Sequence, residues 1–514
     1  MQRPRTTWHF PADLVQRVAL FFPDSVSFFH FLAAFAPYDV LGGLQHMWAL
    51  HHTCGIARDT LWPRLRLDRS PAPVESLHFQ AIFQYYSDID IVGAFDLTWL
   101  HAAMLPPSAA IHFTARYLMH SDFPDEFDIY AWTRLPLVSL DVPLFDMPDA
   151  LDVLAHLPHL TTLRVGYIGA EYAFELESLL QLVSTSTSIT SLTIQQHTTH
   201  VHFFADDTPV QITPAMLSHL IHWLRHRPVR HLAFYLWDFE DVESMMHVLY
   251  DALANCATMT TLEAYESNLT GLAGHTFTRP LTWSSLVLQD CPLSTADTLA
   301  LSTGLSQSSI ASLKLVGKHM DDIMQVVANS LPHMPYLTHL ELHGPSMNQT
   351  DMEALWQSLG RANVTSLTLS GHKMFSLVCQ HLPHTPSLRR LRFFDKDSNA
   401  TICGDTRCGD IAHAIAQSQV TFVDLSHNHI GDVGATQLAH GLQRSRMLRH
   451  LVLDHNSITA KGASVLVQSL CRNRVDPIDR LSLRQNKIHP NDVDMLQNQL
   501  PWRTSQGKIC CLEV

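Results

Sequence analysis

Two stretches near the C-terminus decide the fold: VDLSHNHIGDVGA at residues 423–435 and LVLDHNSITAKGA at residues 451–463. In each, apolar residues alternate with other residues at the start, which is the period of a β-strand that buries one face. An asparagine follows, Asn428 or Asn456, and the apolar spacing then changes to three and four residues, as on one face of a helix. Each stretch is therefore predicted to form a strand, a turn and a helix.

The strand pattern of these stretches recurs through most of the chain. It consists of an apolar residue, two residues of any kind, a second apolar residue, one residue of any kind and a third apolar residue. The second apolar residue advances from Leu140 to Leu481 in twelve steps, about 28 residues each, which lies within the range of roughly 20–29 residues for leucine-rich repeats. The positions of this residue are Leu140, Leu163, Leu192, Leu232, Leu262, Leu286, Leu313, Leu340, Leu367, Leu391, Val423, Leu451 and Leu481.

The turn after each strand has to satisfy buried backbone groups, and stacked asparagine or cysteine side chains can do so as a ladder. Asn428, Asn456 and Asn486 hold this position in the last three repeats, and Cys291 holds it earlier. Most central repeats lack such a residue, so we expect irregular turns there. The residues in its place are Trp237, Lys318, Pro345 and His372.

The two quoted stretches resemble repeats of the ribonuclease-inhibitor type. The resemblance is specific over residues 420–500 and looser back to about residue 137. It implies an α/β leucine-rich-repeat solenoid, a right-handed horseshoe with a concave parallel sheet and convex helices. We expect this solenoid to occupy residues 135–501, followed by a frayed, unmodified tail at 502–514.

Residues 1–70 do not fit the repeat and are predicted to be helical. A Phe-Pro opening at residues 10–11, two amphipathic stretches and a terminal Leu-Trp-x-x-Leu at residues 61–65 resemble an F-box. The resemblance implies that Leu14, Val18, Phe21 and Trp62 contact a ubiquitin-ligase adaptor. The alternative is a helical cap, which a solenoid needs to cover the core of its first repeat.

Residues 71–134 are predicted to hold irregular or degenerate first repeats. Residues 74–79 and 111–113 are candidate strands there, and the solenoid is expected to start near residue 74. A double proline, Pro106 and Pro107, separates the two candidates.

Composition limits the partners and the compartment. The chain has 34 Lys and Arg residues against 48 acidic ones, a net charge of −14, which repels nucleic acid and anionic lipid. Nine scattered cysteines are typical of free thiols in a reducing compartment. With no secretory signal or membrane-spanning stretch recognised, we expect a cytoplasmic or nuclear protein that binds neither membrane nor nucleic acid.

Two clusters stand out among the residues predicted to face outward from the concave sheet. The first consists of Tyr235, Glu263 and Tyr265, in adjacent repeats; the second consists of Arg390, Arg392, Phe394, Phe422 and Asp424. Tyr, Phe and Arg are the side chains that dominate protein interfaces. We therefore predict that one of the clusters binds a protein partner, although such residues can equally pack against neighbouring loops.

No catalytic residue, metal or cofactor is predicted, because the usual nucleotide, zinc-protease and serine-hydrolase motifs are absent from the sequence. His219, His222 and His226 share one face of a predicted helix at a spacing that metals use. With 34 histidines in the chain, a solvated helix face is the favoured interpretation.

Two functions follow from these patterns. The leading one is a substrate-recognition subunit of a cullin-type ubiquitin ligase, with the adaptor on the N-terminal helices and the target on the concave sheet. The other is a free-standing scaffold or inhibitor of the ribonuclease-inhibitor type, with no role in a ligase. They differ in whether the apolar face of Leu14, Val18 and Phe21 is free or buried.

Overall fold

The structure, a computed structural model, describes most of the chain as two compact units. Unit 1 comprises residues 1–210 and 215–235, and unit 2 comprises residues 211–214 and 236–514. The described residues are 11–93, 97, 99–100, 105–106, 108–115, 128–142, 149–166, 173–195, 208–277, 279–317, 327–343, 349–370, 375–394, 404–474, 476–500 and 511–514.

Unit 1 begins with helices packed around aromatic side chains. They are α1 (Ala12–Ala19), α2 (Ser25–Phe35), α3 (Gln45–His52) and α4 (Arg58–Leu61). Asp24 caps α2 by accepting a hydrogen bond from the backbone N–H of Ser27 at 2.8 Å. Trp62 lies in the core of this segment, where it stacks on Phe28 with ring centroids 4.4 Å apart and donates from its indole nitrogen to the Phe22 carbonyl at 2.8 Å.

The strands of unit 1 form a parallel ladder, in which each strand pairs with the next. They are β1 (Leu65–Leu67), β2 (Asp88–Val92), β3 (Ala110–Thr114), β4 (Leu137–Val142), β5 (Thr162–Val165), β6 (Ser191–Ile194) and β8 (His231–Tyr235). The candidate strand at 111–113 is thus confirmed. The ladder starts at residue 65 rather than near residue 74.

The candidate strand at 74–79 is wrong, because this segment lies in a helix, α5 (Pro73–Ile82). Pro73 occupies the first turn, where its missing N–H costs nothing. The Glu75 carboxylate accepts a hydrogen bond from the Ala72 backbone N–H at 2.8 Å. Glu75, Phe79 and Ile82 are buried, a helical spacing of four and three residues. The remaining helices of this part are α6 (Ala150–Leu154), α7 (Ala173–Thr185) and α8 (Pro214–His226).

Unit 2 continues the same architecture with in-register parallel strands. They are β10 (Thr261–Tyr265), β11 (Ser285–Gln289), β12 (Ser312–Val316), β13 (His339–His343), β14 (Ser366–Ser370), β15 (Arg390–Phe394), β16 (Phe422–Asp424), β17 (His450–Val452) and β18 (Arg480–Ser482). The middle residue of every one of the thirteen predicted apolar triplets lies within a strand of unit 1 or unit 2 and is buried. The predicted class, an α/β repeat solenoid, is confirmed.

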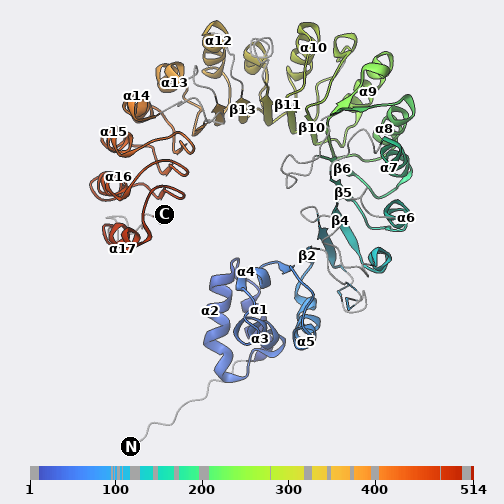
Figure 1. Cartoon of the computed structure of the whole chain (residues 1–514), viewed down its shortest axis with the longest axis horizontal. Coiled ribbons are helices and arrows are strands. Elements are labelled where there is room, and N and C mark those ends of the chain that lie inside the picture. The colour runs from blue at the N-terminus through green and yellow to red at the C-terminus, as the bar shows by residue number, and fades with distance from the viewer. Residues whose placement is uncertain are drawn as a thin grey trace, which may run out of the picture. The chain divides into compact units, whose positions relative to one another are not determined.

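The helices of unit 2 lie on the outer side of its curved row of repeats, and the strands lie on the inner side (Figure 1). They are α9 (Glu243–Asn255), α10 (Thr295–Leu305), α12 (Gln349–Leu359), α13 (Phe375–His381), α14 (Gly404–Gln417), α15 (Asp432–Leu442), α16 (Ala460–Leu466) and α17 (Pro490–Asn498). The outward-facing residues of β10–β18 therefore line the concave surface of this unit.

The predicted asparagine ladder is present in the last repeats. The Asn456 carbonyl oxygen accepts hydrogen bonds from the backbone N–H groups of Asn428 and Ile430, both at 3.0 Å. Its amide nitrogen donates to the carbonyls of Leu425 and Leu453 at 3.0 and 2.9 Å. Cys291 makes the corresponding bond earlier in the chain, donating from its thiol to the Ala264 carbonyl at 3.4 Å. The turns at Lys318, Pro345 and His372, expected to be irregular, lie outside the described residues.

A second ladder, of aspartates, links successive helices. Asp405 of α14 accepts hydrogen bonds from the N–H groups of Gly431 and Gly434 at 2.7 and 2.9 Å, at the start of α15. Asp432 of α15 does the same for Thr459 and Gly462 at the start of α16, at 2.9 and 3.1 Å. Each helix is thus capped by the helix of the preceding repeat, which fixes the spacing between them.

The chain end is ordered, so the expected frayed tail is wrong for its last residues. Residues Cys511–Glu513 form strand β19, which pairs in parallel with β18. The Leu483 N–H donates to the Glu513 carbonyl at 2.7 Å. A strand here lengthens the sheet by one further member.

Candidate protein-binding site

The predicted cluster on β15 and β16 comes together as a contiguous surface. Arg390 is paired in register with Phe422, and Arg392 with Asp424. The Arg390 guanidinium carbon lies 4.2 Å from the centre of the Phe422 ring, a cation–π contact. The Arg392 Nε donates to Asp424 Oδ2 at 2.8 Å.

Phe394 completes the cluster at the end of β15. Its ring centroid lies 5.0 Å from that of His343, a buried residue two strands away on β13. All five residues predicted for this cluster therefore lie on adjoining strands and contact a neighbouring side chain, with Arg390 and Arg392 exposed.

The surface continues into a hollow of about 480 Å³ that extends to the end of the chain. Its lining combines apolar, acidic and basic side chains from successive repeats. These are Arg392, Phe394, Phe422, Asp424, Ser426, His427, Val452, Asp454, His455, Arg480, Ser482, Arg484 and Glu513. The volume lies in the range of roughly 300–1,000 Å³ that suits a bound ligand.

Glu513 holds two arginines at the far side of the hollow. Arg480 and Arg484 approach its carboxylate at 2.6 and 3.0 Å. The hydrogen bond from Arg480 is the main reason that the pKa of Glu513 lies below its ordinary value. The sequence did not predict Glu513 as a site residue, because residues 502–514 were expected to form a tail, whereas Glu513 lies in strand β19 and is half-buried.

Two histidines at the rim of the hollow stack on each other. His427 and His455 have ring centroids 4.2 Å apart and planes 12° from parallel. Both have a positive φ, 59° and 54°, because each precedes a ladder asparagine in the turn. Burial, and the neighbouring His455, lower the pKa of His427 below its ordinary value, so protonation of His427 is disfavoured.

A polar network next to Phe394 was also missed from the sequence. The Glu341 carboxylate lies 2.7 Å from His343 Nε2 and 3.0 Å from Lys314 Nζ. His343 Nδ1 lies 2.9 Å from Ser370 Oγ. The network crosses three strands, β12 to β14. The sequence indicates part of it, because the repeat register pairs Lys314 with Glu341 on neighbouring strands.

The other predicted concave cluster is divided between the two units. Glu263 and Tyr265 belong to unit 2, and the Tyr265 hydroxyl donates to the Glu263 carboxylate at 2.6 Å. Tyr235 ends β8 of unit 1. The structure thus shows the hydrogen-bonded pair of Glu263 and Tyr265, and the grouping of all three residues stays a prediction.

The four residues predicted to contact an adaptor separate into two environments. Leu14, Val18 and Phe21 are exposed to 48%, 41% and 85%, and they lie on or just after α1, while Val15 and Ala19 of the same helix are buried. Trp62 is only 7% exposed. The predicted contact of Trp62 with an adaptor does not fit this burial, because the indole stacks on Phe28 and bonds to the Phe22 carbonyl in the core of the segment.

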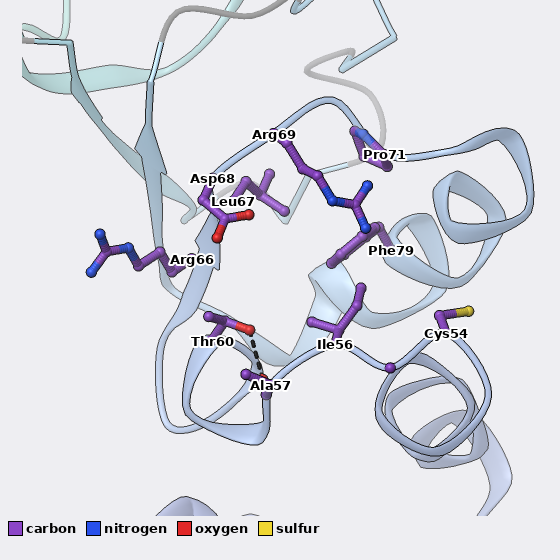
Figure 2. Close-up of a pocket in the computed structure, with 11 residues that line it drawn as sticks. Cys54, Ile56, Ala57, Thr60, Arg66, Leu67, Asp68, Arg69, Pro71 and Phe79 are labelled. Atoms are coloured by element: carbon purple, nitrogen blue, oxygen red, sulfur yellow. Dashed lines mark hydrogen bonds between the residues drawn. The ribbon is translucent and has the colours of Figure 1, made fainter. Parts of the chain in front are cut away.

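A smaller pocket, of about 210 Å³, lies between the end of α3, strand β1 and α5 (Figure 2). Arg69 at its rim pairs with Glu75 through two hydrogen bonds of 2.8 and 2.7 Å, and Thr60 donates to the Ala57 carbonyl at 2.6 Å. The charged group is thus compensated inside the protein. The volume is below the usual size of a ligand site.

The histidine face considered for a metal consists of half-buried or exposed side chains on α8. His222 and His226 stack with ring centroids 4.2 Å apart. Within the described ranges, no three His, Cys, Asp or Glu residues gather as metal ligands would. None of the helices in the same ranges combines the length and apolar character needed to cross a membrane.

A match to a family model agrees with the repeat architecture of the last repeats. A family model described as Leucine Rich repeat matches residues 419–439 and 444–467. No curated protein matches the chain. Among solved structures, the chain is similar to an internalin from Listeria monocytogenes, with 14% identity, a TM-score of 0.32, and coverage of 65% of this chain and 94% of that one.

The observations that bear on identity are the parallel strands in register, the asparagine ladder between them, and the family match to the repeats that carry this ladder. Solenoids of this kind present extended surfaces to other proteins. The chain therefore folds as an α/β leucine-rich-repeat solenoid, with leucine-rich repeats matched at residues 419–439 and 444–467.

Proposed function

We propose that this protein is a substrate-recognition subunit of a cullin-type ubiquitin ligase. In this role the N-terminal helices dock the ligase adaptor, and the concave strands of unit 2 hold the target protein. The transfer chemistry belongs to the partners. The observation that carries the proposal is the exposed apolar face of Leu14, Val18 and Phe21.

Exposure of these three side chains supports a docking role because a cap would bury its apolar residues against the first repeat. Phe21 is the most exposed of them, at 85%, and large apolar residues grouped on a surface mark interaction sites. The rest of the helical segment is tied to the repeats, since the Tyr86 hydroxyl donates to the Leu61 carbonyl. The segment is therefore firmly anchored while one face of α1 stays available.

The target-binding role rests on the cluster of Arg390, Arg392, Phe394, Phe422 and Asp424. Arginine and aromatic side chains contribute most of the free energy at interfaces, and here they adjoin a hollow. Glu263 and Tyr265 are a second candidate contact at the other end of unit 2.

The proposal is tested by purifying the full chain from a eukaryotic lysate and identifying the adaptor and cullin that accompany it. The variant carries Val18→Asp and Phe21→Asp, which place charge on the exposed face. Leu299→Asp is the matched control, because Leu299 on α10 is 65% exposed. We expect adaptor and cullin with the wild type and the control, and neither with the variant.

Adaptor that is absent from all three preparations would reject the ligase role. The protein would then be the free-standing scaffold or inhibitor of the ribonuclease-inhibitor type. One observation favours this second candidate: α4 packs against β1, as a helical cap would.

A further inference from the structure

The charged groups of the hollow are arranged by depth, with acids beneath arginines. The side chains of Arg392, Arg480 and Arg484 are exposed to 51%, 46% and 58%, whereas those of Asp424 and Glu513 are exposed to 11% and 18%. The groups that reach solvent are therefore mainly guanidinium groups, although the whole chain carries a net charge of −14.

The carboxylates are also engaged inside the protein. Asp424 accepts from Arg392 and from the Ser426 hydroxyl at 2.6 Å. Asp454 accepts from the Ser482 hydroxyl and the Arg484 N–H at 2.7 and 2.9 Å. A cationic partner would have to displace these donors. An anionic partner would find free donors, because a guanidinium group has five N–H groups and one carboxylate occupies two at most.

Arg390 adds a cation without a matching acid. Its guanidinium stacks on the Phe422 ring, and among the described residues it takes part in no ion pair with a carboxylate. Stacking fixes the plane of the guanidinium and leaves its edge donors available, which suits bidentate binding of a carboxylate. Arg390 is thus pre-organised to receive an acidic group.

The register sets the distance between the anchoring cations. Arg390, Phe422, His450 and Arg480 lie side by side in one row across β15 to β18. Strands lie about 4.8 Å apart, so the two arginines are about 14 Å apart, which an extended peptide covers in about four residues. A ligand with two acidic residues separated by three others would reach both.

We propose that the concave surface of β15–β19 recognises an acidic, extended segment of a partner protein, with Arg390 and Arg480 each binding one carboxylate. This inference rests on the proposed target-binding role of the same cluster. A peptide is favoured over nucleic acid because the net charge of −14 opposes the approach of a long phosphate backbone.

The test uses the full chain and fluorescein-labelled decapeptides of one background sequence, read by fluorescence anisotropy. One carries Glu-x-x-x-Glu, one has Gln at both positions, and one has Lys at both. We expect the Glu peptide to bind at least tenfold more tightly than the other two. The double variant Arg390→Ala and Arg480→Ala should lose that tenfold preference, whereas Arg361→Ala, an exposed arginine after α12, should keep it.

A charge-reversed chain, Arg390→Glu and Arg480→Glu, guards against a variant that merely unfolds, because it should now prefer the Lys peptide. Equal binding of the three peptides by the wild type, no binding of the Glu peptide, or equal binding of an oligothymidylate would overturn the inference. Recovery of the adaptor depends on α1 and not on these residues, so the two proposals fail separately.

Discussion

At the scale of single residues, Glu341 shows how the sheet retains a charge on its concave side. Burial alone would raise the pKa of this carboxyl, but hydrogen bonds from His343 and Lys314 outweigh it and bring the pKa to about 2. The folded-state pKa thus lies below the ordinary value of 4.5. Glu341 therefore stabilises the fold above pH 4.5, and this contribution is lost as the pH falls toward 2.

We predict that Glu341→Gln lowers the free energy of unfolding at pH 7 by about 1 kcal/mol, a value reduced for the exposed part of the side chain. The difference from the wild type should shrink as the pH falls from 4.5. Urea unfolding at pH 7 and at pH 3 measures it, with Glu240→Gln, an exposed glutamate, as the control. If the difference in free energy of unfolding stays constant with pH, the charge of Glu341 does not stabilise the fold.

Some residues of the site and the fold could be predicted from the sequence and others could not, and the difference has a physical cause. The ladder asparagines were predictable because each follows its strand at a fixed distance. The contacts of His343 with Glu341 and Ser370 depend on the side-chain rotamers of the three residues, and no pattern along the sequence specifies those rotamers. Trp62 was predicted to contact an adaptor because it belongs to the F-box-like motif. A motif of this kind does not indicate whether the side chain is exposed or buried in the core.

At the scale of elements, the close packing of α14 on α15 depends on a residue without a side chain. A Cβ added at Gly434 would lie 2.6 Å from Asp405 Oδ1 and 2.8 Å from Cys408 Sγ. The same Asp405 caps α15, so a displaced carboxylate also loses its hydrogen bonds to the N–H groups of Gly431 and Gly434.

We predict that Gly434→Ala lowers the free energy of unfolding by about 1–3 kcal/mol, as expected for overpacking. Gly274→Ala is the control, because a Cβ there meets nothing within 4 Å, and it should change stability little. Urea unfolding of both variants decides the matter. Equal stability of the two variants would contradict the prediction, because it would mean that α14 and α15 accommodate the added Cβ without loss of free energy of unfolding.

The elements predicted correctly are those whose residues satisfy two rules at once. Each of the thirteen triplets has inward apolar residues at period two and a place in a register of about 28 residues. Strand β19 satisfies neither rule, because its central residue, Leu512, is only half-buried. Strand β2 satisfies the first rule, since Ile89 and Ile91 alternate with aspartates, but it lies before the regular repeats and was not predicted. The helix at Pro73 was mistaken for a strand because three apolar residues were weighed without the proline and glutamate that start it.

At the scale of the whole molecule, each repeat of a solenoid is stabilised only by its own contacts and by those with the adjacent repeats. Strand β19 contacts the rest of the sheet through β18. We predict that removing residues 511–514 speeds amide hydrogen exchange in β18 and its turn and leaves β10–β13 unchanged. Mass spectrometry of peptic fragments can measure this.

The full-length variant Glu513→Gln is the matched control, since it loses the ion pairs with Arg480 and Arg484 but keeps the backbone bonds of β19. Its exchange should resemble the wild type. Faster exchange throughout the chain after the truncation would contradict nearest-neighbour stabilisation.

The asparagine ladder has a further consequence for how such a chain can change in length. The donors and acceptors that Asn456 offers to the repeat before it are those that Asn486 offers to Ile458 and Leu453. A segment copied from one asparagine to the next therefore offers the same hydrogen-bonding groups at both ends. If it is inserted between β16 and β17, the ladder bonds can form on both sides of it. Gene duplication can extend this surface one repeat at a time, and each added strand brings a new row of variable side chains.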